Sequence, residues 1–223
     1  MYDIWNPFDP NPDDTSRERA RLSKRLVELQ QALHVALIDL RLVVENVRRS
    51  EDQVDAALRP FHTEFDDVPA HPDDLPEIER LCRLVWEKGG TDQAALQRIL
   101  IGLVGNTASP SCLPFFLDAL RFTKRGDSFG PERRQLAIWG LARLARWNNL
   151  PEAYAAVQSG LDDRHPEVRL TAADLLLDAY LDAGRAVPPE VRSKLAQMAK
   201  TDPDLDLRRQ FSKYLDEPWG DKA

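Results

Sequence analysis

The segment DDRHPEVRLTAADLLLDAY, Asp162 to Tyr180, decides how this chain folds. Two acidic residues and a histidine lie shortly before Pro166, and apolar residues follow at helical spacing. Proline is favoured in the first turn of a helix, because its missing N–H would have no partner there. The segment therefore predicts a turn followed by a helix, although its carboxylates could also belong to a catalytic or metal-binding cluster.

Segments with a similar residue pattern recur at regular distances along the chain. Three other segments share with VRLTAADLL (from Val168) a polar second position, a small or apolar fifth and an apolar ninth: LQRILIGLV (from Leu96), RRQLAIWGL (from Arg133) and LRRQFSKYL (from Leu207). Their second positions are 37, 35 and 39 residues apart, a period that indicates stacked helix pairs. Turn signals with proline predict companion helices at Leu81–Glu87, Leu113–Phe122, Ala153–Gln158 and Val191–Met198.

An aspartate in a turn, followed six residues later by an arginine that comes directly after an apolar residue, marks two of the repeats, as Asp163 with Val168-Arg169 and Asp202 with Leu207-Arg208. This pattern resembles the HEAT-repeat (armadillo-like) family of α-solenoids over residues 76–217. The resemblance implies an all-α fold, a short right-handed α-solenoid of about four helix pairs, with Asp–Arg bonds between neighbouring repeats. The first two repeats depart from it, since Thr91 and Gln97 replace the pair in one and the loop TKRGDSFGP interrupts it in the other.

The remaining chain is expected to form an extended proline-rich arm at 1–14, helix at 15–60, an acidic linker at 61–75 and a tail at 218–223. A capping-box pattern at Ser50 and Gln53 favours a helical hairpin whose second helix ends at Arg59. The alternative is one long continuous helix, which could pair with a second copy as a coiled coil. We expect the N-terminal helices either to cap the open end of the repeat domain or to join two copies as a homodimer.

Composition limits the function. At 223 residues and 43% hydrophobic content the chain can bury its own core. Its net charge of -7 argues against nucleic-acid binding over the whole surface. No leader-like start and no long apolar stretch is visible, and Cys82 and Cys112 have no disulfide or zinc spacing, so we expect a cytoplasmic chain that does not enter membranes.

The segment HTEFDDVPAHPDD, residues 62–74, is rich in metal-ligand side chains. Its weak candidates for a metal-dependent activity are His62, Glu64, His71 and Asp73. The spacing matches neither a zinc motif nor a calcium loop, and an acidic linker explains the same composition.

No nucleophile elbow, phosphate-binding loop or dinucleotide fingerprint occurs in the sequence. We therefore predict no cofactor and a non-catalytic adaptor or scaffold. A solenoid of this kind binds a protein or peptide on its concave face, which the second helix of each pair lines.

The repeat offset predicts which residues lie on that face. Asp174, Asp178 and Asp182 form an acidic row, and an offset of 35 residues carries them onto Trp139, Arg143 and Trp147. The other offsets add Asn106 and Lys213. Tryptophan and arginine are enriched at binding hot spots. Two other interpretations stay open, in which Trp139 is core between repeats and the acidic row is only a solvated face.

A basic run within residues 121–146 supports an alternative function. It comprises Arg121, Lys124, Arg125, Arg133, Arg134, Arg143 and Arg146. Such a run could bind nucleic acid, as in DNA glycosylases built on similar repeats, or could consist of exposed solubilising charges.

Overall fold

A computed structural model describes residues 16–45, 51–65, 68–88 and 93–216. In this part the chain is all-α, with ten α-helices, three short 3-10 turns and no strand. The predicted fold class is confirmed at this level. The predicted arm at 1–14 and tail at 218–223 lie outside the described residues.

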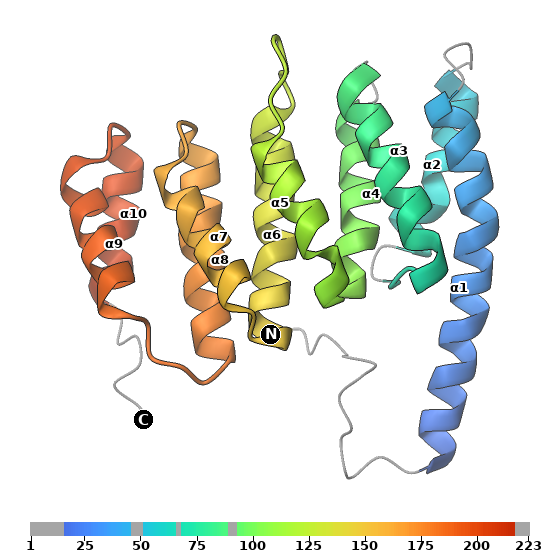
Figure 1. The fold of residues 1–223 in the computed structure, drawn as a ribbon, viewed down its shortest axis with the longest axis horizontal. Helices are drawn as coiled ribbons and strands as arrows, with labels where there is room; N and C mark the ends of the chain where they lie inside the picture. Colours follow the sequence, from blue (N-terminus) through green and yellow to red (C-terminus); the bar gives the residue numbers. More distant parts are fainter. Residues whose placement is uncertain (1–15, 46–50, 66–67, 89–92, 217–223) are drawn as a thin grey trace.

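Eight of the helices form four contacting pairs in chain order. They are α3 (Leu75–Lys88) with α4 (Gln93–Thr107), α5 (Leu113–Arg121) with α6 (Gly130–Asn148), α7 (Pro151–Ser159) with α8 (Pro166–Asp182), and α9 (Pro189–Thr201) with α10 (Leu205–Asp216). Each pair contains one predicted companion helix and one helix of the repeated pattern. The pairs stand side by side in a single row (Figure 1), and α6 also packs against α4 and α8.

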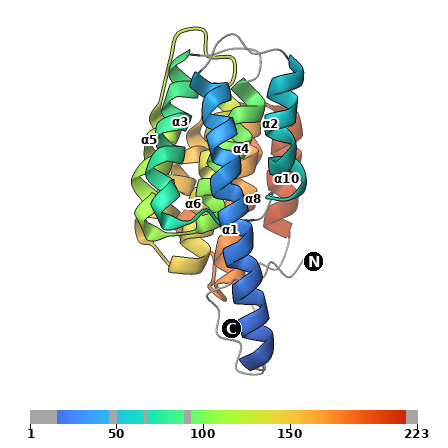
Figure 2. The ribbon, with the colours of Figure 1, turned by 90° about the vertical axis from the view of Figure 1, so that its right-hand side faces the viewer.

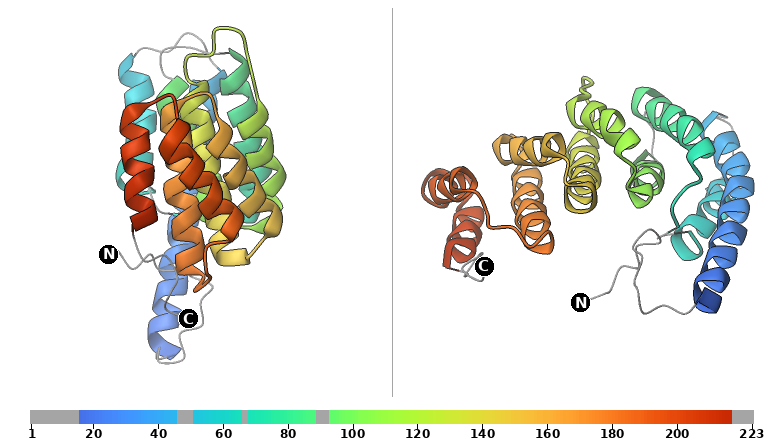
Figure 3. Two further views of the ribbon diagram at one scale, coloured as in Figure 1. Left: turned by 90° about the vertical axis from the view of Figure 1, so that its left-hand side faces the viewer. Right: turned by 60° about the horizontal axis from the view of Figure 1, so that its bottom comes forward.

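The row is two layers deep and curved. Figure 3 shows α3, α5, α7 and α9 on the outside of an arc and α4, α6, α8 and α10 on its inside. In the described part of the chain, no further helix lies across the inner side of the row. The exposed side of α6 and α8 therefore forms an inner face that a ligand could reach.

Close approach between the layers depends on small residues. A Cβ atom added to Gly140 of α6 would lie 2.2 Å from the ring of Phe116 of α5, far inside any real contact. Phe116 is completely buried. Glycine is therefore required where α5 crosses α6, because the aromatic ring occupies the space of a side chain.

The first two helices form a hairpin at one end of the row. α1 (Ser16–Glu45) and α2 (Glu51–Thr63) contact each other, and α1 also packs on α3 (Figure 1). Leu33, Leu37 and Leu40 of α1 are buried in this contact region. The two helices lie side by side, so they are not one continuous helix; residues 46–50 between them lie outside the described part.

The prediction that the second helix ends at Arg59 is wrong. α2 continues through Pro60 to Thr63, and the carbonyl of Pro60 accepts hydrogen bonds from the backbone of Glu64 (2.8 Å) and Phe65 (3.1 Å). A proline inside a helix costs about 3 kcal/mol. Phe61 and Phe65 are both 3% exposed, and burying two such side chains contributes about 3–6 kcal/mol, which offsets that cost.

The predicted linker at 61–75 is also not a solvated segment. Val68 and Ala70 are buried, and Pro72–Asp74 forms a 3-10 turn leading into α3. Asp74 is buried and its carboxylate lies 2.6 Å from Nδ1 of His34 on α1. The apolar residues between the acidic ones pack this segment against the end of the row. The acidic composition therefore wrongly predicted a solvated linker.

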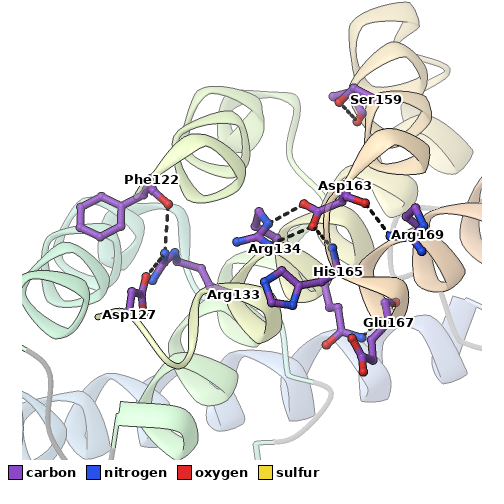
Figure 4. Close-up of polar contacts among 11 residues, drawn as sticks. Phe122, Asp127, Arg133, Arg134, Ser159, Asp163, His165, Glu167 and Arg169 are labelled. Atoms are coloured by element: carbon purple, nitrogen blue, oxygen red, sulfur yellow. Dashed lines mark hydrogen bonds and ion pairs between the residues drawn. The ribbon is translucent and has the colours of Figure 1, made fainter. Parts of the chain in front are cut away.

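Buried ion pairs join neighbouring turns. Arg169 of α8 donates two hydrogen bonds to Asp202 (2.8 and 2.7 Å), and Arg134 of α6 donates two to Asp163 (2.6 and 3.0 Å; Figure 4). Burial alone would raise the pKa of Asp202, but the bonds from Arg169 outweigh it and hold that pKa below its usual range. These bonds connect the second helix of one pair to the turn within the next pair.

The turn before α6 also has an aspartate six residues before an arginine, although this arginine follows Glu132 and not an apolar residue. Asp127 precedes Arg133 by six residues, and Arg133 donates to its carboxylate and to the carbonyl of Phe122 (3.0 Å; Figure 4). The guanidinium of Arg133 is fully buried, 5.6 Å from the centroid of the Trp86 ring. Arg133 thus bonds to the turn that leads into its own helix, and Arg134 bonds to the turn before α8. In α8 the single residue Arg169 makes both kinds of bond, to the carbonyl of Asp163 and to the carboxylate of Asp202.

Candidate partner-binding site

Three predicted residues of α6 stack on one another along its inner face. The guanidinium carbon of Arg143 lies 4.8 Å from the ring centroid of Trp139 and 4.0 Å from that of Trp147. Residues four apart in a helix lie one turn above each other, which brings the three side chains into contact. All three are half-buried. The arginine is therefore held between two aromatic faces and still reaches the surface.

Trp139 belongs partly to the packing between helices. A Cβ atom added to Gly105 of α4 would lie 2.1 Å from its ring, so one side of the indole fills the space beside that glycine. The other interpretation, an exposed binding residue, is also partly right, because Trp139 is not fully buried. The predicted Asn106 follows Gly105 on α4 and is half-buried.

The predicted acidic row lies on α8, directly beside these residues. Asp182 forms an ion pair with Arg146 of α6 at 2.9 Å, and Asp174 accepts a hydrogen bond from the hydroxyl of Tyr214 on α10. Asp178 is exposed between them. The helices α6, α8 and α10 are thus joined across the inner face by side-chain bonds, and the predicted residues of α6 and α8 are brought together.

The environment of the row disfavours negative charge. Burial raises the pKa of Asp174 to about 6, and the neighbouring Asp178 adds to the rise. Partial desolvation also raises the pKa of the Asp178 carboxyl, with Asp182 adding to the rise and Arg146 opposing it. A cationic group placed over this row would stabilise the ionised carboxylates, so the row is suited to receiving positive charge.

Sequence reasoning missed residues that shape this face, and one predicted residue stays apart. Tyr214, Gly105 and Arg146 were not assigned to the site, although Tyr214 follows Asp174 by 40 residues, close to the repeat length. Lys213 is exposed on α10 and makes no hydrogen bond or ion pair with any described residue.

The basic run of residues 121–146 does not form one surface. Arg133 and Arg134 are buried in ion pairs, Arg143 lies between the tryptophans, and Arg146 binds Asp182. The members that stay exposed at the turn between α5 and α6 are Arg121, Lys124 and Arg125. The helical geometry of α6 directs successive arginines to different sides of the helix. The order of charges in the sequence therefore does not show which arginines are buried and which are exposed.

The candidate metal ligands are divided between separate places. His62 and Glu64 are exposed at the end of α2, whereas Nδ1 of His71 accepts a hydrogen bond from the backbone N–H of Asp73 (3.3 Å) and caps the 3-10 turn. Among the described residues, which do not include Asp66 and Asp67, no three metal-ligand side chains gather at one point. The residues present give no support for a metal centre there.

Two further observations concern the whole chain. No helix in the described ranges combines the length and the apolar character needed to cross a membrane. Comparison of the chain with protein-family models, with curated proteins and with solved structures gives no match in any of the three.

Proposed function

We propose that this chain is a HEAT-like right-handed α-solenoid that acts as a non-catalytic adaptor, binding a protein or peptide partner on the inner face of α6 and α8. The curved row of helix pairs and the Asp–Arg bonds between their turns support the solenoid assignment. The two free, buried cysteines are in keeping with a cytoplasmic location.

The observation that carries the proposal is the stack of Arg143 between Trp139 and Trp147 on the inner face, which no further described helix crosses. Binding hot spots are enriched in tryptophan and arginine, which combine a large contact area with directed polar groups. A side chain already held in place loses little further conformational freedom when a partner binds. The stack is therefore prepared for contact and not only for packing.

The neighbouring carboxylates indicate the chemistry of the partner. Asp178 is exposed beside the stack, and partial desolvation by the surrounding helices raises the pKa values of both Asp174 and Asp178. A lysine or arginine side chain of the partner would neutralise this row, and an apolar side chain next to it would cover the indole rings. The proposed partner segment is thus basic with at least one large apolar residue.

An array of short peptides that vary in net charge and apolar content tests this proposal. The full chain should bind basic, apolar-containing peptides and reject acidic ones. Arg143→Ala should weaken this binding by tenfold or more, whereas Arg83→Ala should leave it unchanged. Arg83 is the matched control, because it is a partly exposed arginine of α3 with its own ion pair, to Asp118 on α5.

Two outcomes would refute the assignment. Equal loss of binding in both arginine variants would mean that the inner face has no special role. Retention of a duplex oligonucleotide at low salt, with no peptide bound, would favour the alternative nucleic-acid function instead.

A further inference from the structure

The helices α6 and α8 run parallel along the inner face, and side-chain bonds fix which of their residues lie beside each other. Near the starts of the two helices, the side chain of Gln135 donates a hydrogen bond to the hydroxyl of Thr171 (3.1 Å). Near their ends, Arg146 pairs with Asp182 (2.9 Å). Each contact joins residues 36 positions apart in the sequence. The two helices therefore keep the same direction and the same register over this length.

This register sets the stack of α6 beside the acidic row of α8. Within each set, successive members are four residues apart, so each set follows one side of its helix. The middle members, Arg143 and Asp178, lie at about the same level. Both indole rings lie within 5 Å of the Arg143 guanidinium carbon, at 4.8 and 4.0 Å, so the stack forms one continuous surface.

Asp178 is the member of the acidic row that is open to a partner. Asp174 accepts a hydrogen bond from the hydroxyl of Tyr214. Asp182 pairs with Arg146. Asp178 is exposed and makes no hydrogen bond or ion pair with any described residue. Partial desolvation raises the pKa of its carboxyl, so a cation brought to it would stabilise the ionised form.

The inner face offers a partner few backbone groups to bond with. Apart from their ends, α6 and α8 use their backbone N–H and C=O groups within the helix, and the described residues contain no sheet edge that an extended segment could join (Figure 3). An extended peptide would leave its own backbone groups without partners where it covers this face. A helix bonds its own backbone, so only its side chains have to meet the surface.

We propose that the partner segment is an α-helix lying along α6 and α8, with two large apolar side chains over the stack and one lysine or arginine over Asp178. This inference rests on the proposed function and specifies the shape of its partner. Apolar residues four apart in a helix are roughly 6 Å apart along its axis at ~1.5 Å per residue, and together they cover the stack. The cation belongs over α8, because Arg143 would repel it over α6.

Isothermal titration with designed helical peptides tests the arrangement. The probes are alanine- and glutamine-based peptides of about 18 residues, long enough to form a helix, with two leucines four residues apart and one lysine. Lysine at the first or the third position after the first leucine lies beside the leucines, and the direction of the bound helix decides which of the two fits. Lysine at the second position lies on the opposite side, so this peptide is a control of identical composition. One of the first two peptides should bind at least tenfold more tightly than the control, and equal binding of all three overturns the proposal.

A substitution on the protein tests where the cation lies. Asp178→Asn keeps the shape of the side chain and removes its charge, so the affinity should no longer depend on the position of the lysine. Asp118→Asn is the matched control, because Asp118 is an exposed aspartate of the outer helix α5, and this variant should keep the tenfold difference. A preference that persists in Asp178→Asn overturns the placement of the cation.

A proline in the middle of the best peptide, on the side away from the leucines, tests the helical shape. It should abolish binding, because proline breaks a helix. Undiminished binding would mean that the segment binds in an extended form, and overturns the proposal.

Failure of this inference is distinguishable from failure of the proposed function. If peptides of the array bind in a way that Arg143→Ala weakens, but the designed peptides bind equally, the helical partner is overturned and the adaptor function stands. If neither the array nor the designed peptides bind, both proposals are overturned.

Discussion

Arg169 and Asp202 show how single residues join one helix pair to the next. Their side chains are 8% and 2% exposed, and two hydrogen bonds connect them. Taking charges out of water is costly, and the pair offsets this cost only while both partners are present. The bond is therefore more sensitive to the loss of one partner than a surface ion pair is.

Asp202→Asn should lower the free energy of unfolding by about 3 kcal/mol, because it leaves the charge of Arg169 buried without its counter-charge. Asp162→Asn is the matched control: Asp162 also binds a cation, Lys194, but its side chain is 71% exposed. Breaking such a surface pair costs about 0–1 kcal/mol. Urea denaturation measures both values, and equal losses would contradict the structural role given to the buried pair.

Asp174 should make the stability of the chain decrease as the pH rises. This direction is opposite to that expected from Asp202, whose pKa is lowered. The pKa of Asp174 in the folded chain is about 6, above the ordinary value of about 3.9 expected when unfolded. The folded state therefore holds this proton more tightly, and the stability contributed by Asp174 falls as the pH rises from about 4 to about 6. Melting temperatures of the unchanged chain, measured relative to Asp174→Asn, should decrease across this range. Parallel pH profiles of the two proteins would show that the carboxyl group is not perturbed.

Residue patterns in the sequence predicted part of the candidate site. The 35-residue offset placed Trp139, Arg143 and Trp147 beside the acidic row, because the period of the repeat fixes which side of each helix faces inward. It could not predict that Arg133 is buried while Arg146 binds Asp182, since both are only arginines in a basic run. That difference arises from contacts between elements.

Two glycines in neighbouring helices differ in whether a side chain would fit at their position. Gly140 of α6 lies against the buried ring of Phe116, whereas a Cβ atom at Gly102 of α4 would meet nothing within 4 Å. The first glycine allows two helices to approach closely. The second only weakens its own helix.

Gly140→Ala should therefore destabilise the chain by about 1–3 kcal/mol, the usual cost of inserting a methyl group into a packed core. Gly102→Ala should stabilise it by about 0.5–1 kcal/mol, because alanine favours the helix and reduces the freedom of the unfolded chain. Thermal or urea unfolding measures both changes. A stabilised Gly140→Ala variant would mean that α5 and α6 do not approach as closely as described.

The helix pairs were predictable as elements, but their boundaries and connections were not. Proline signals located the starts of α7, α8 and α9, since proline fits the first turn of a helix. The same rule failed at Pro60, where burial of Phe61 and Phe65 continues the helix. Local propensity is a weak prior, and tertiary packing overrode it at this position.

The described part of the chain is a curved row with two regions that no other described helix covers. One is the inner face, where α6 and α8 present the tryptophan–arginine stack and the acidic row (Figure 3). The other is the outer side of α1 at one end of the row (Figure 2), where Val27, Val35, Ile38 and Leu42 are exposed.

Isothermal titration of a basic peptide selected from the array tests the inner-face assignment most directly. Two charge reversals are compared, Asp178→Lys on the inner face and Asp118→Lys on the outer helix α5, both at exposed aspartates. The account predicts at least tenfold weaker binding for Asp178→Lys, equivalent to about 1.4 kcal/mol, and less than a twofold change for Asp118→Lys. Equal affinities of the two variants would contradict binding on the inner face.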